Sequence, residues 1–453
     1  MIALFEQVKK VFRRPLSLFA FSSIVSIGTL LLYNIPFFRF VIDNSNESPL
    51  GVTWLTVSLV IIMLVLNFMM ACLAMFCLFQ PVVIGKVKKL AIYCGSSLAI
   101  ILVVALLNIN QTLFISQHDT ELGGLLQPWS YIANTCRVIS FMQDEQAEEI
   151  KLPDGKITDN EKAVVVLVIG ESARKANFQL YGYKRDTNPL LSTQQKLKVF
   201  QTQSCATYTT AGTKAILEPK DCGDLYELLP NYAFRTGVDV SWRTSNWGEP
   251  PIHIDEYLTD SELADMYPDV DGNYDGILYA GLRQRIESSP KNKVLIILHT
   301  STSHGPQYAK KYPKEFEAYK PVAQNVEEGE KHVDRLVNAY DNSIRYTDYL
   351  LNGLIDTLQT MKDWKRAMIF ISDHGESLGE NKMFMHGLPM KLAPKEQYEI
   401  PFFVWTSDNF RTYKSNLPAV LEQHYIFHSV LNLLSIQSPA YNEEFDIFVN
   451  PKR

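Results

Sequence analysis

The sequence predicts an α/β domain, with a mixed, largely parallel sheet between helices, that follows a set of N-terminal transmembrane helices. Three observations lead to this prediction. Long apolar stretches fill the first quarter of the 453-residue chain, short apolar runs alternate with helical periodicity from residue 162 onward, and polar clusters follow several of these runs. We therefore expect a membrane domain at 1–110, a juxtamembrane helix and linker at 111–161, and the α/β domain at 162–453.

Three apolar stretches, at 16–38, 53–79 and 90–107, are long enough to cross a bilayer, because about 20 helical residues span its hydrocarbon core. Buried core helices and a cleaved signal peptide are the alternatives. Soluble helices are rarely apolar on all sides, and the first stretch has no clear small-residue cleavage site. Three spans are therefore the preferred interpretation.

Positive charge predicts the orientation of these spans. The loop at 43–49 carries acids but no Lys or Arg, whereas basic residues precede the first and third spans. They are Lys9, Lys10, Arg13, Arg14, Lys86, Lys88 and Lys89. Because basic residues mark the cytoplasmic side, everything after residue 110 is expected outside the cytoplasm. The segment that follows, 111–142, fits either an interfacial helix or an ordinary juxtamembrane helix, and 143–161 reads as a linker.

Composition limits the partners and the disulfides. The net charge is −6, and no Lys/Arg stripe interleaved with aromatic residues occurs, so nucleic acid is not an expected partner. Of six cysteines, three lie in the apolar stretches. Cys136, Cys205 and Cys222 lie in polar sequence, where an oxidising compartment could form one disulfide.

Five apolar runs are predicted as strands and one long segment as a helix. The helix is 333–358, in which the apolar residues recur on one face. The strands are 163–169, 238–242, 294–298, 367–371 and 401–405.

Polar residues follow three of these strands. Glu171 comes after the first, His304 after the third, and Asp373 with His374 after the fourth. Ligand sites in such sheets lie beyond the carboxyl ends of the strands. His386 lies in another short loop that contains glycine. Carboxylates and imidazoles together favour a catalytic zinc ion, although each loop judged alone would more often be a surface turn or hold a structural histidine.

Longer stretches around these residues resemble the bacterial phosphoethanolamine transferases, which modify lipid A and related envelope targets. The matching stretches are VIGESARKANFQLYGYKRDTNP from residue 168, SCATYTTAG from 204, TSHGPQYAKKYP from 302, YDNSIRYTDYLL from 340 and SDHGESLGENKMFMHGLP from 372. The resemblance covers nearly the whole chain. It implies an alkaline-phosphatase-like, or sulfatase-like, catalytic domain in the periplasm, attached to the bacterial inner membrane.

The resemblance also implies the ligands of the metal. Carried over residue by residue, the zinc ligands fall on Glu171, Thr209, Asp373 and His374, with Thr209 as the nucleophile. The residues alone do not single out Thr209, because a threonine-rich turn is typical of a helix cap.

Further site residues are implied in the same way. His304 and His386 would bind substrate or a second metal, and Asn246 would contact substrate, although this chain lacks the lysine that relatives place nearby. His386 would protonate the leaving oxygen, and Glu376 would orient the site or meet the substrate ammonium.

The implied reaction has two steps. Thr209 attacks the phosphorus of phosphatidylethanolamine, diacylglycerol leaves, and the phosphoethanolamine group passes from the threonine to lipid A, the lipopolysaccharide core or another envelope acceptor. Zinc and a helix N-terminus would lower the pKa of the threonine hydroxyl.

This chain departs from its relatives in two further features. The proline and cysteine that usually follow the nucleophile are replaced by Gly212, Thr213 and Lys214, so Cys205 pairs with Cys222 or stays free. Relatives commonly have five spans rather than three.

Three other functions are alternatives. A hydrolase or sulfatase of the same superfamily lacks support, because the Cys/Ser-x-Pro-Ser-Arg context of sulfatases is absent. A phosphoglycerol transferase would use a different lipid head group. A catalytically inactive membrane sensor would not need the complete ligand set.

Overall fold

The computed structural model describes residues 149–220, 226–408 and 410–449, all within the second of two compact units of the chain, Ala147–Arg453. The predicted spans at 16–38, 53–79 and 90–107, and the segment 111–142, lie outside the described residues. Among the residues that are described, no helix is both long enough and apolar enough to cross a membrane.

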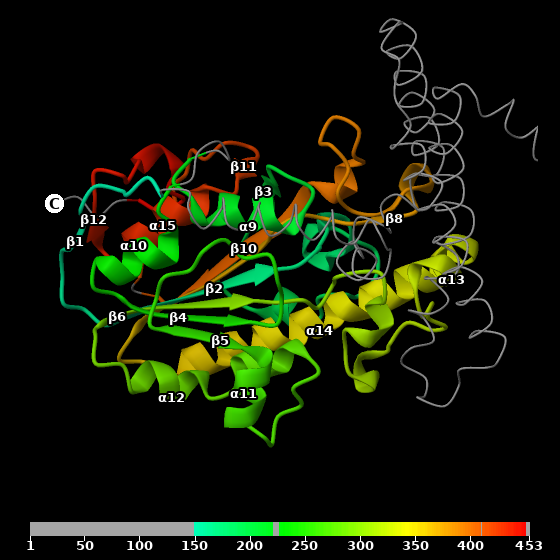
Figure 1. Cartoon of the computed structure of the whole chain (residues 1–453), viewed down its shortest axis with the longest axis horizontal. Coiled ribbons are helices and arrows are strands. Elements are labelled where there is room, and N and C mark those ends of the chain that lie inside the picture. The colour runs from blue at the N-terminus through cyan, green and yellow to red at the C-terminus, as the bar shows by residue number, and fades with distance from the viewer. Residues whose placement is uncertain (1–148, 221–225, 409, 450–453) are drawn as a thin grey trace, which may run out of the picture. The chain divides into compact units, whose positions relative to one another are not determined.

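The centre of this unit is an eight-stranded mixed sheet with the strand order β11-β3-β10-β7-β2-β6-β4-β5 (Figure 1). The strands are β2 (Ala163–Gly170), β3 (Leu197–Gln203), β4 (Asp239–Thr244), β5 (Glu256–Thr259), β6 (Lys293–His299), β7 (Lys365–Ser372), β10 (Glu399–Thr406) and β11 (Leu421–Glu422). Strands β7, β2, β6, β4 and β5 are parallel, whereas β10 runs antiparallel to both β7 and β3. The prediction of a mixed, largely parallel sheet is confirmed, as are the five predicted strands.

Helices cover both faces of the sheet (Figure 1). Side chains of β2 alternate between two apolar clusters, with Val165, Leu167 and Ile169 in one and Val164, Val166 and Val168 in the other. The first cluster includes residues of α9 (Thr209–Leu217), α10 (Leu229–Arg235) and α15 (Tyr425–Leu433). The second includes residues of α11 (Asp260–Met266), α12 (Leu282–Glu287) and α14 (Val333–Thr360). Burial on both faces explains why the strand sequences are continuously apolar.

Short elements complete the unit. Strands β1 (Lys156–Ile157) and β12 (Ile436–Gln437) pair with each other, and helix α13 (Val326–Lys331) packs on α14. Strands β8 (Ser377–Leu378) and β9 (Phe384–Met385) form a hairpin between β7 and β10. This hairpin belongs to the segment 373–398, which carries several of the predicted site residues.

The long helix α14 confirms the predicted helix at 333–358 and contains an exposed glycine. A Cβ atom at Gly353 would meet nothing within 4 Å. Because glycine in a helix interior costs about 1 kcal/mol relative to alanine, Gly353→Ala is expected to raise the free energy of unfolding by about 0.5–1 kcal/mol. The measurement is the denaturation midpoint of the α/β unit in the full chain. An unchanged or lower midpoint would contradict this prediction.

Candidate active site

The sheet brings polar loops together at one edge. Parallel pairing places Gly170 of β2 opposite Ser372 of β7, so Glu171 and Asp373 leave neighbouring strands at the same level. His304 lies in the loop after β6, the other neighbour of β2. The common edge that was predicted from the sequence is therefore present.

Thr209 reaches this edge by another route. Strand β3 is antiparallel to β10, which is antiparallel to β7, so β3 runs in the same sense as β7 and ends at the same edge. After β3 the chain turns, and Thr209 is the first residue of helix α9. The hydroxyl group therefore lies at the positive end of a helix, a position that favours negative charge.

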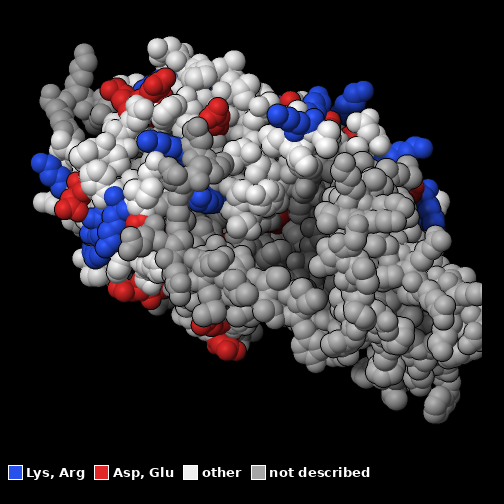
Figure 2. All heavy atoms as spheres, turned by 45° about the horizontal axis from the view of Figure 1, so that its top comes forward, with Lys and Arg blue, Asp and Glu red and all other residues white. Residues whose placement is uncertain are grey.

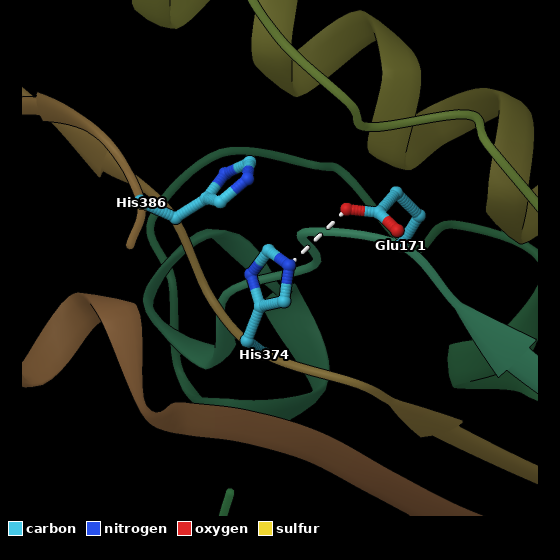
Figure 3. A group of neighbouring side chains, drawn as sticks. All are labelled: Glu171, His374 and His386. Atoms are coloured by element: carbon cyan, nitrogen blue, oxygen red, sulfur yellow. Dashed lines mark ion pairs between the residues drawn. The ribbon is translucent and has the colours of Figure 1, made fainter. Parts of the chain in front are cut away.

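The four predicted metal ligands converge at this edge. The Thr209 Oγ1 atom lies 3.2 Å from Glu171 Oε2 and 3.3 Å from His374 Nε2. The same His374 nitrogen lies 3.3 Å from Glu171 Oε1 and 3.4 Å from Asp373 Oδ2. Figure 3 shows Glu171 and His374 facing each other, with His386 beside them. All four ligands are buried, and Thr209 has the largest exposed fraction, 7%.

The surroundings of these ligands fit a metal ion. The Nδ1 atom of His374 donates to the carbonyl oxygen of Gly375 at 2.8 Å, which orients Nε2 toward the carboxylates. Oxygen Oδ1 of Asp373 accepts bonds from the backbone of Ser172 and His374, at 3.1 and 2.7 Å. Oxygen Oδ2 is buried and has no hydrogen-bond partner among the described residues. A buried carboxylate oxygen without a partner is costly, and a bound cation would remove that cost.

The electrostatics are those of a charged, closely coupled cluster. Burial would raise the pKa of Glu171, but the neighbouring imidazoles, His374 first, hold this pKa well below its usual range. Burial together with the Glu171 charge raises the pKa of Asp373 to about 7. Burial would lower the pKa of His374, but Asp373 and Glu171 outweigh it and raise the pKa to about 10.

His386 and Glu376 form a pair next to the four ligands. His386 offers a nitrogen within 4.8 Å of ligand atoms of Glu171 and His374, and its Nδ1 atom lies 3.2 Å from Glu376 Oε1. Burial raises the pKa of Glu376 to about 8, and burial with the His374 charge lowers the pKa of His386 to about 3. A protonated Glu376 therefore donates to Nδ1 of a neutral His386, whose Nε2 carries the remaining proton.

This pairing bears on the two roles expected for Glu376. Its side chain is completely buried, with 0% exposure, and it contacts His386. These contacts fit a residue that orients His386 better than one that meets a substrate ammonium. The ring of His304 lies farther out, with its centroid 5.6 Å from that of His386.

Asn246 also reaches the site. Its Nδ2 atom donates to Glu171 Oε2 at 2.6 Å and to the carbonyl oxygen of Thr300 at 3.0 Å. It also lies 3.2 Å from Nε2 of His299. His299 in turn pairs with Glu249 through Nδ1 at 2.8 Å. His299 and Glu249 thus hold the side chain of Asn246 in position.

Two supporting residues were missed. Ser172 has a φ of 54°, an unusual conformation for a residue with a side chain, and its hydroxyl donates to Glu171 Oε1 at 2.7 Å. Gln423 donates to the carbonyl oxygen of Asp373 at 2.7 Å and accepts from the backbone of Cys205 at 3.0 Å. The position of Ser172 directly after Glu171, in the loop that follows the first strand, was a usable signal, but nothing in the sequence marks Gln423.

The structure tests part of the expected pairing of Cys205. Cys205, four residues before Thr209, is disulfide-bonded. No other cysteine is among the described residues, so the partner, whether Cys222 or another, lies outside them.

Comparison with known proteins defines the class of this site. Residues 163–436 match the family model described as Sulfatase. The match covers the whole sheet and every ligand discussed above. The fold and the site are therefore those of a sulfatase-like α/β domain of the alkaline phosphatase superfamily.

Individual relatives narrow the class. The phosphoethanolamine transferase EptA of Helicobacter pylori is 38% identical over 360 residues, which cover 77% of this chain and 68% of that protein. The soluble domain of lipooligosaccharide phosphoethanolamine transferase A from Neisseria meningitidis superposes with a TM-score of 0.61 at 29% identity, covering 68% of this chain and 99% of that one. The integral membrane form of the same enzyme gives 0.63 at 25% identity, covering 84% and 77%. The chain belongs to the phosphoethanolamine transferase family and is an enzyme that transfers phosphoethanolamine.

Proposed function

We propose that this enzyme transfers phosphoethanolamine from phosphatidylethanolamine to lipid A or the lipopolysaccharide core through a covalent intermediate on Thr209. The observation that carries the proposal is the position of the Thr209 hydroxyl. It lies at the start of α9 and within 3.2–3.3 Å of both Glu171 and His374. A threonine in this position is set up as a nucleophile rather than as a helix cap, because Tyr208 occupies the N-cap position of α9.

Zinc is the proposed cofactor, held by Glu171, Thr209, Asp373 and His374. Two carboxylates, one imidazole and one hydroxyl are ligands that zinc accepts, and the unpartnered Oδ2 of Asp373 supports a cation there. When bound, zinc would lower the pKa of the threonine hydroxyl and withdraw negative charge from the phosphoryl group. A second ion near His304 and His386 is not required by the contacts of the described residues.

The residues of the chain supply the rest of the reaction. As the bond between Thr209 Oγ1 and phosphorus forms and the bond from phosphorus to diacylglycerol breaks, the nearest carboxylate oxygen for the threonine proton is Glu171 Oε2, at 3.2 Å. The proton on Nε2 of His386 is available to the leaving oxygen, and the proton of Glu376 passes to Nδ1 at the same time, so the imidazole stays neutral. In the second step an acceptor oxygen attacks the same phosphorus, the bond to Thr209 breaks, and the threonine regains its proton.

The proposed location follows from the apolar N-terminal stretches and from the relatives. We propose three spans, at 16–38, 53–79 and 90–107, in the bacterial inner membrane, with residues 162–453 as a periplasmic catalytic domain. The similarity to an integral membrane transferase supports this arrangement. Membrane attachment would give the site access to a lipid donor and to an envelope acceptor.

Trapping the intermediate tests this function. The full chain is incubated in detergent with phosphatidylethanolamine labelled in the head group, without acceptor, and is then digested for mass spectrometry. We expect one phosphoethanolamine group on the peptide that contains Thr209, and none in Thr209→Ala.

The matched control is Thr210→Ala, which removes the neighbouring, exposed hydroxyl of α9 and should keep the modification. A label on another residue would refute the role of Thr209. Release of free phosphoethanolamine to water at the transfer rate, with lipid A present, would identify a hydrolase instead.

A further inference from the structure

A cavity of about 460 Å³ opens next to the candidate active site. We call it the Trp247 cavity. It is lined by Asn246, Trp247, Gly248, Glu249, Pro250, Ile252 and Tyr257. Asn246 lines this cavity and also contacts the candidate active site, because its Nδ2 atom donates a hydrogen bond to Glu171 at 2.6 Å. A ligand that reacts at Thr209 can therefore extend into this cavity.

The turn that forms the cavity packs against the start of α9. Gly248 has a φ of +82°, and a Cβ atom there would lie 3.4 Å from Oγ1 of Thr210 and 4.0 Å from Cγ2 of Thr209. Only the width of a small group therefore separates the cavity wall from the nucleophilic residue. A substituent joined to the reacting phosphorus through a short linker, such as two methylene groups, can reach it.

The lining residues suit a positively charged group. Trp247 and Tyr257 are 63% and 37% exposed, so both are accessible to a ligand. No lysine or arginine of the described residues lines this cavity. Aromatic faces attract ammonium groups, most strongly those of tryptophan.

The cavity also contains a carboxylate. Burial would raise the pKa of Glu249, but its hydrogen bond to His299 and the charge of that residue lower it, so the group stays ionised. The described side chains that donate to Glu249, Thr244 and His299, both bond to Oε1. Oxygen Oε2 accepts no side-chain hydrogen bond from the described residues and can receive one from a ligand.

A second cavity, of about 330 Å³, provides the contrast. Tyr274 and Asp275 line it together with His304, Lys310 and Lys311, and the His304 ring lies 6.5 Å from that of Trp247. Both cavities therefore contain an aromatic ring and a carboxylate, but of the two only the second is lined by lysine, and only the Trp247 cavity by tryptophan. Figure 2 shows one face of the molecule, on which the described basic and acidic side chains form small separate groups of both signs.

We propose that the Trp247 cavity binds the primary ammonium of the phosphoethanolamine group, with Trp247 as the residue that determines head-group specificity. This inference rests on the proposed donor, phosphatidylethanolamine. It assigns the ammonium a site that does not use Glu376, and it explains why the enzyme would reject neutral head groups such as phosphoglycerol.

The test compares two donors of the same size. Phosphatidylpropanol has a methyl group in place of the ammonium of phosphatidylethanolamine. Diacylglycerol release by the full chain in mixed micelles gives kcat/KM for each donor. We expect the wild-type enzyme to prefer phosphatidylethanolamine, and Trp247→Leu to lower kcat/KM for this donor by about 5- to 30-fold while changing that for phosphatidylpropanol less than about twofold. Trp247→Phe should retain most of the preference.

Tyr349→Leu is the matched control, because Tyr349 is 52% exposed on α14 and does not line either cavity. Its donor preference should equal that of the wild type. An equal loss with both donors in Trp247→Leu, as expected for a lipid-contacting or purely structural tryptophan, would overturn the inference and leave the proposed function intact. Absence of diacylglycerol release from phosphatidylethanolamine by the wild-type enzyme would refute the proposed function and the inference with it.

Discussion

Asp373→Ala is expected to lose the bound zinc and to transfer phosphoethanolamine at least about 10³-fold more slowly than the wild type. The substitution removes one of four converging ligands, the one whose Oδ2 atom has no hydrogen-bond partner among the described residues. A catalytic metal contributes several kcal/mol of charge stabilisation, and each 1.36 kcal/mol corresponds to a factor of ten in rate. Metal analysis of the purified full chain and the transfer rate to lipid A are the measurements.

Two controls separate loss of the ligand from loss of the fold. Asp373→Asn keeps the size of the side chain and the acceptor for the backbone bonds of Ser172 and His374, so it should fold normally and still bind zinc weakly. Asp363→Ala, at an exposed position before β7, should keep both zinc and activity. Full zinc content together with full activity in Asp373→Ala would refute the proposed metal site.

Gly212→Ala is expected to lower transfer on the order of 10²-fold, although alanine is the better helix former. A Cβ atom at Gly212 would lie 2.3 Å from the carbonyl oxygen of Asp373 and 2.8 Å from its carbonyl carbon. These are backbone atoms, so helix α9 has to move away, and Thr209 moves with it. A displacement of about 1 Å in a catalytic group can cost 10²-fold in rate, and overpacking of this kind costs about 1–3 kcal/mol of stability.

The comparison with Gly353→Ala makes this prediction specific. Both glycines lie in helices, and both substitutions carry the same gain in helix propensity. Only Gly212 touches another backbone segment within 4 Å, whereas Gly353 faces open space. We expect opposite shifts in the unfolding midpoint and a loss of transfer in Gly212→Ala alone. A normal rate in that variant would show that α9 does not set the position of Thr209.

The sheet could be predicted from the sequence because its strands are apolar on both faces. The runs at 163–169, 294–298 and 367–371 belong to strands at the parallel centre of the sheet. Strand β3 was missed, because Leu197–Gln203 alternates buried and exposed residues and contains only three apolar side chains. A run of apolar residues identifies a strand that is buried on both faces more reliably than a strand near the edge of a sheet.

Only some of the site residues could be predicted from the sequence pattern. The positions of Glu171, Asp373 and His374 follow from strand ends alone, since parallel strands bring their carboxyl ends to one edge. Thr209 was predicted only from the resemblance. Its position depends on the direction of β3, and that direction can be predicted only if β10 is known to be antiparallel. The contact between Glu376 and His386 depends on the β8–β9 hairpin, which no periodicity indicated. The Trp247 cavity depends on side-chain exposure, which a sequence does not reveal.

The antiparallel direction of β10 has a consequence for how this enzyme family can diversify. The segment 373–398 leaves the sheet at the end of β7 and re-enters it at the start of β10, and both points lie at the active edge. Its base is tied together by backbone bonds from Gly375 and Glu376 to Gln397 and Glu396. Insertions, deletions or exchanges beyond this base would leave the register of every strand unchanged. The segment is therefore a natural unit for exchange between homologues, and chimeras made at its base would replace His386 together with its surroundings on an unchanged sheet.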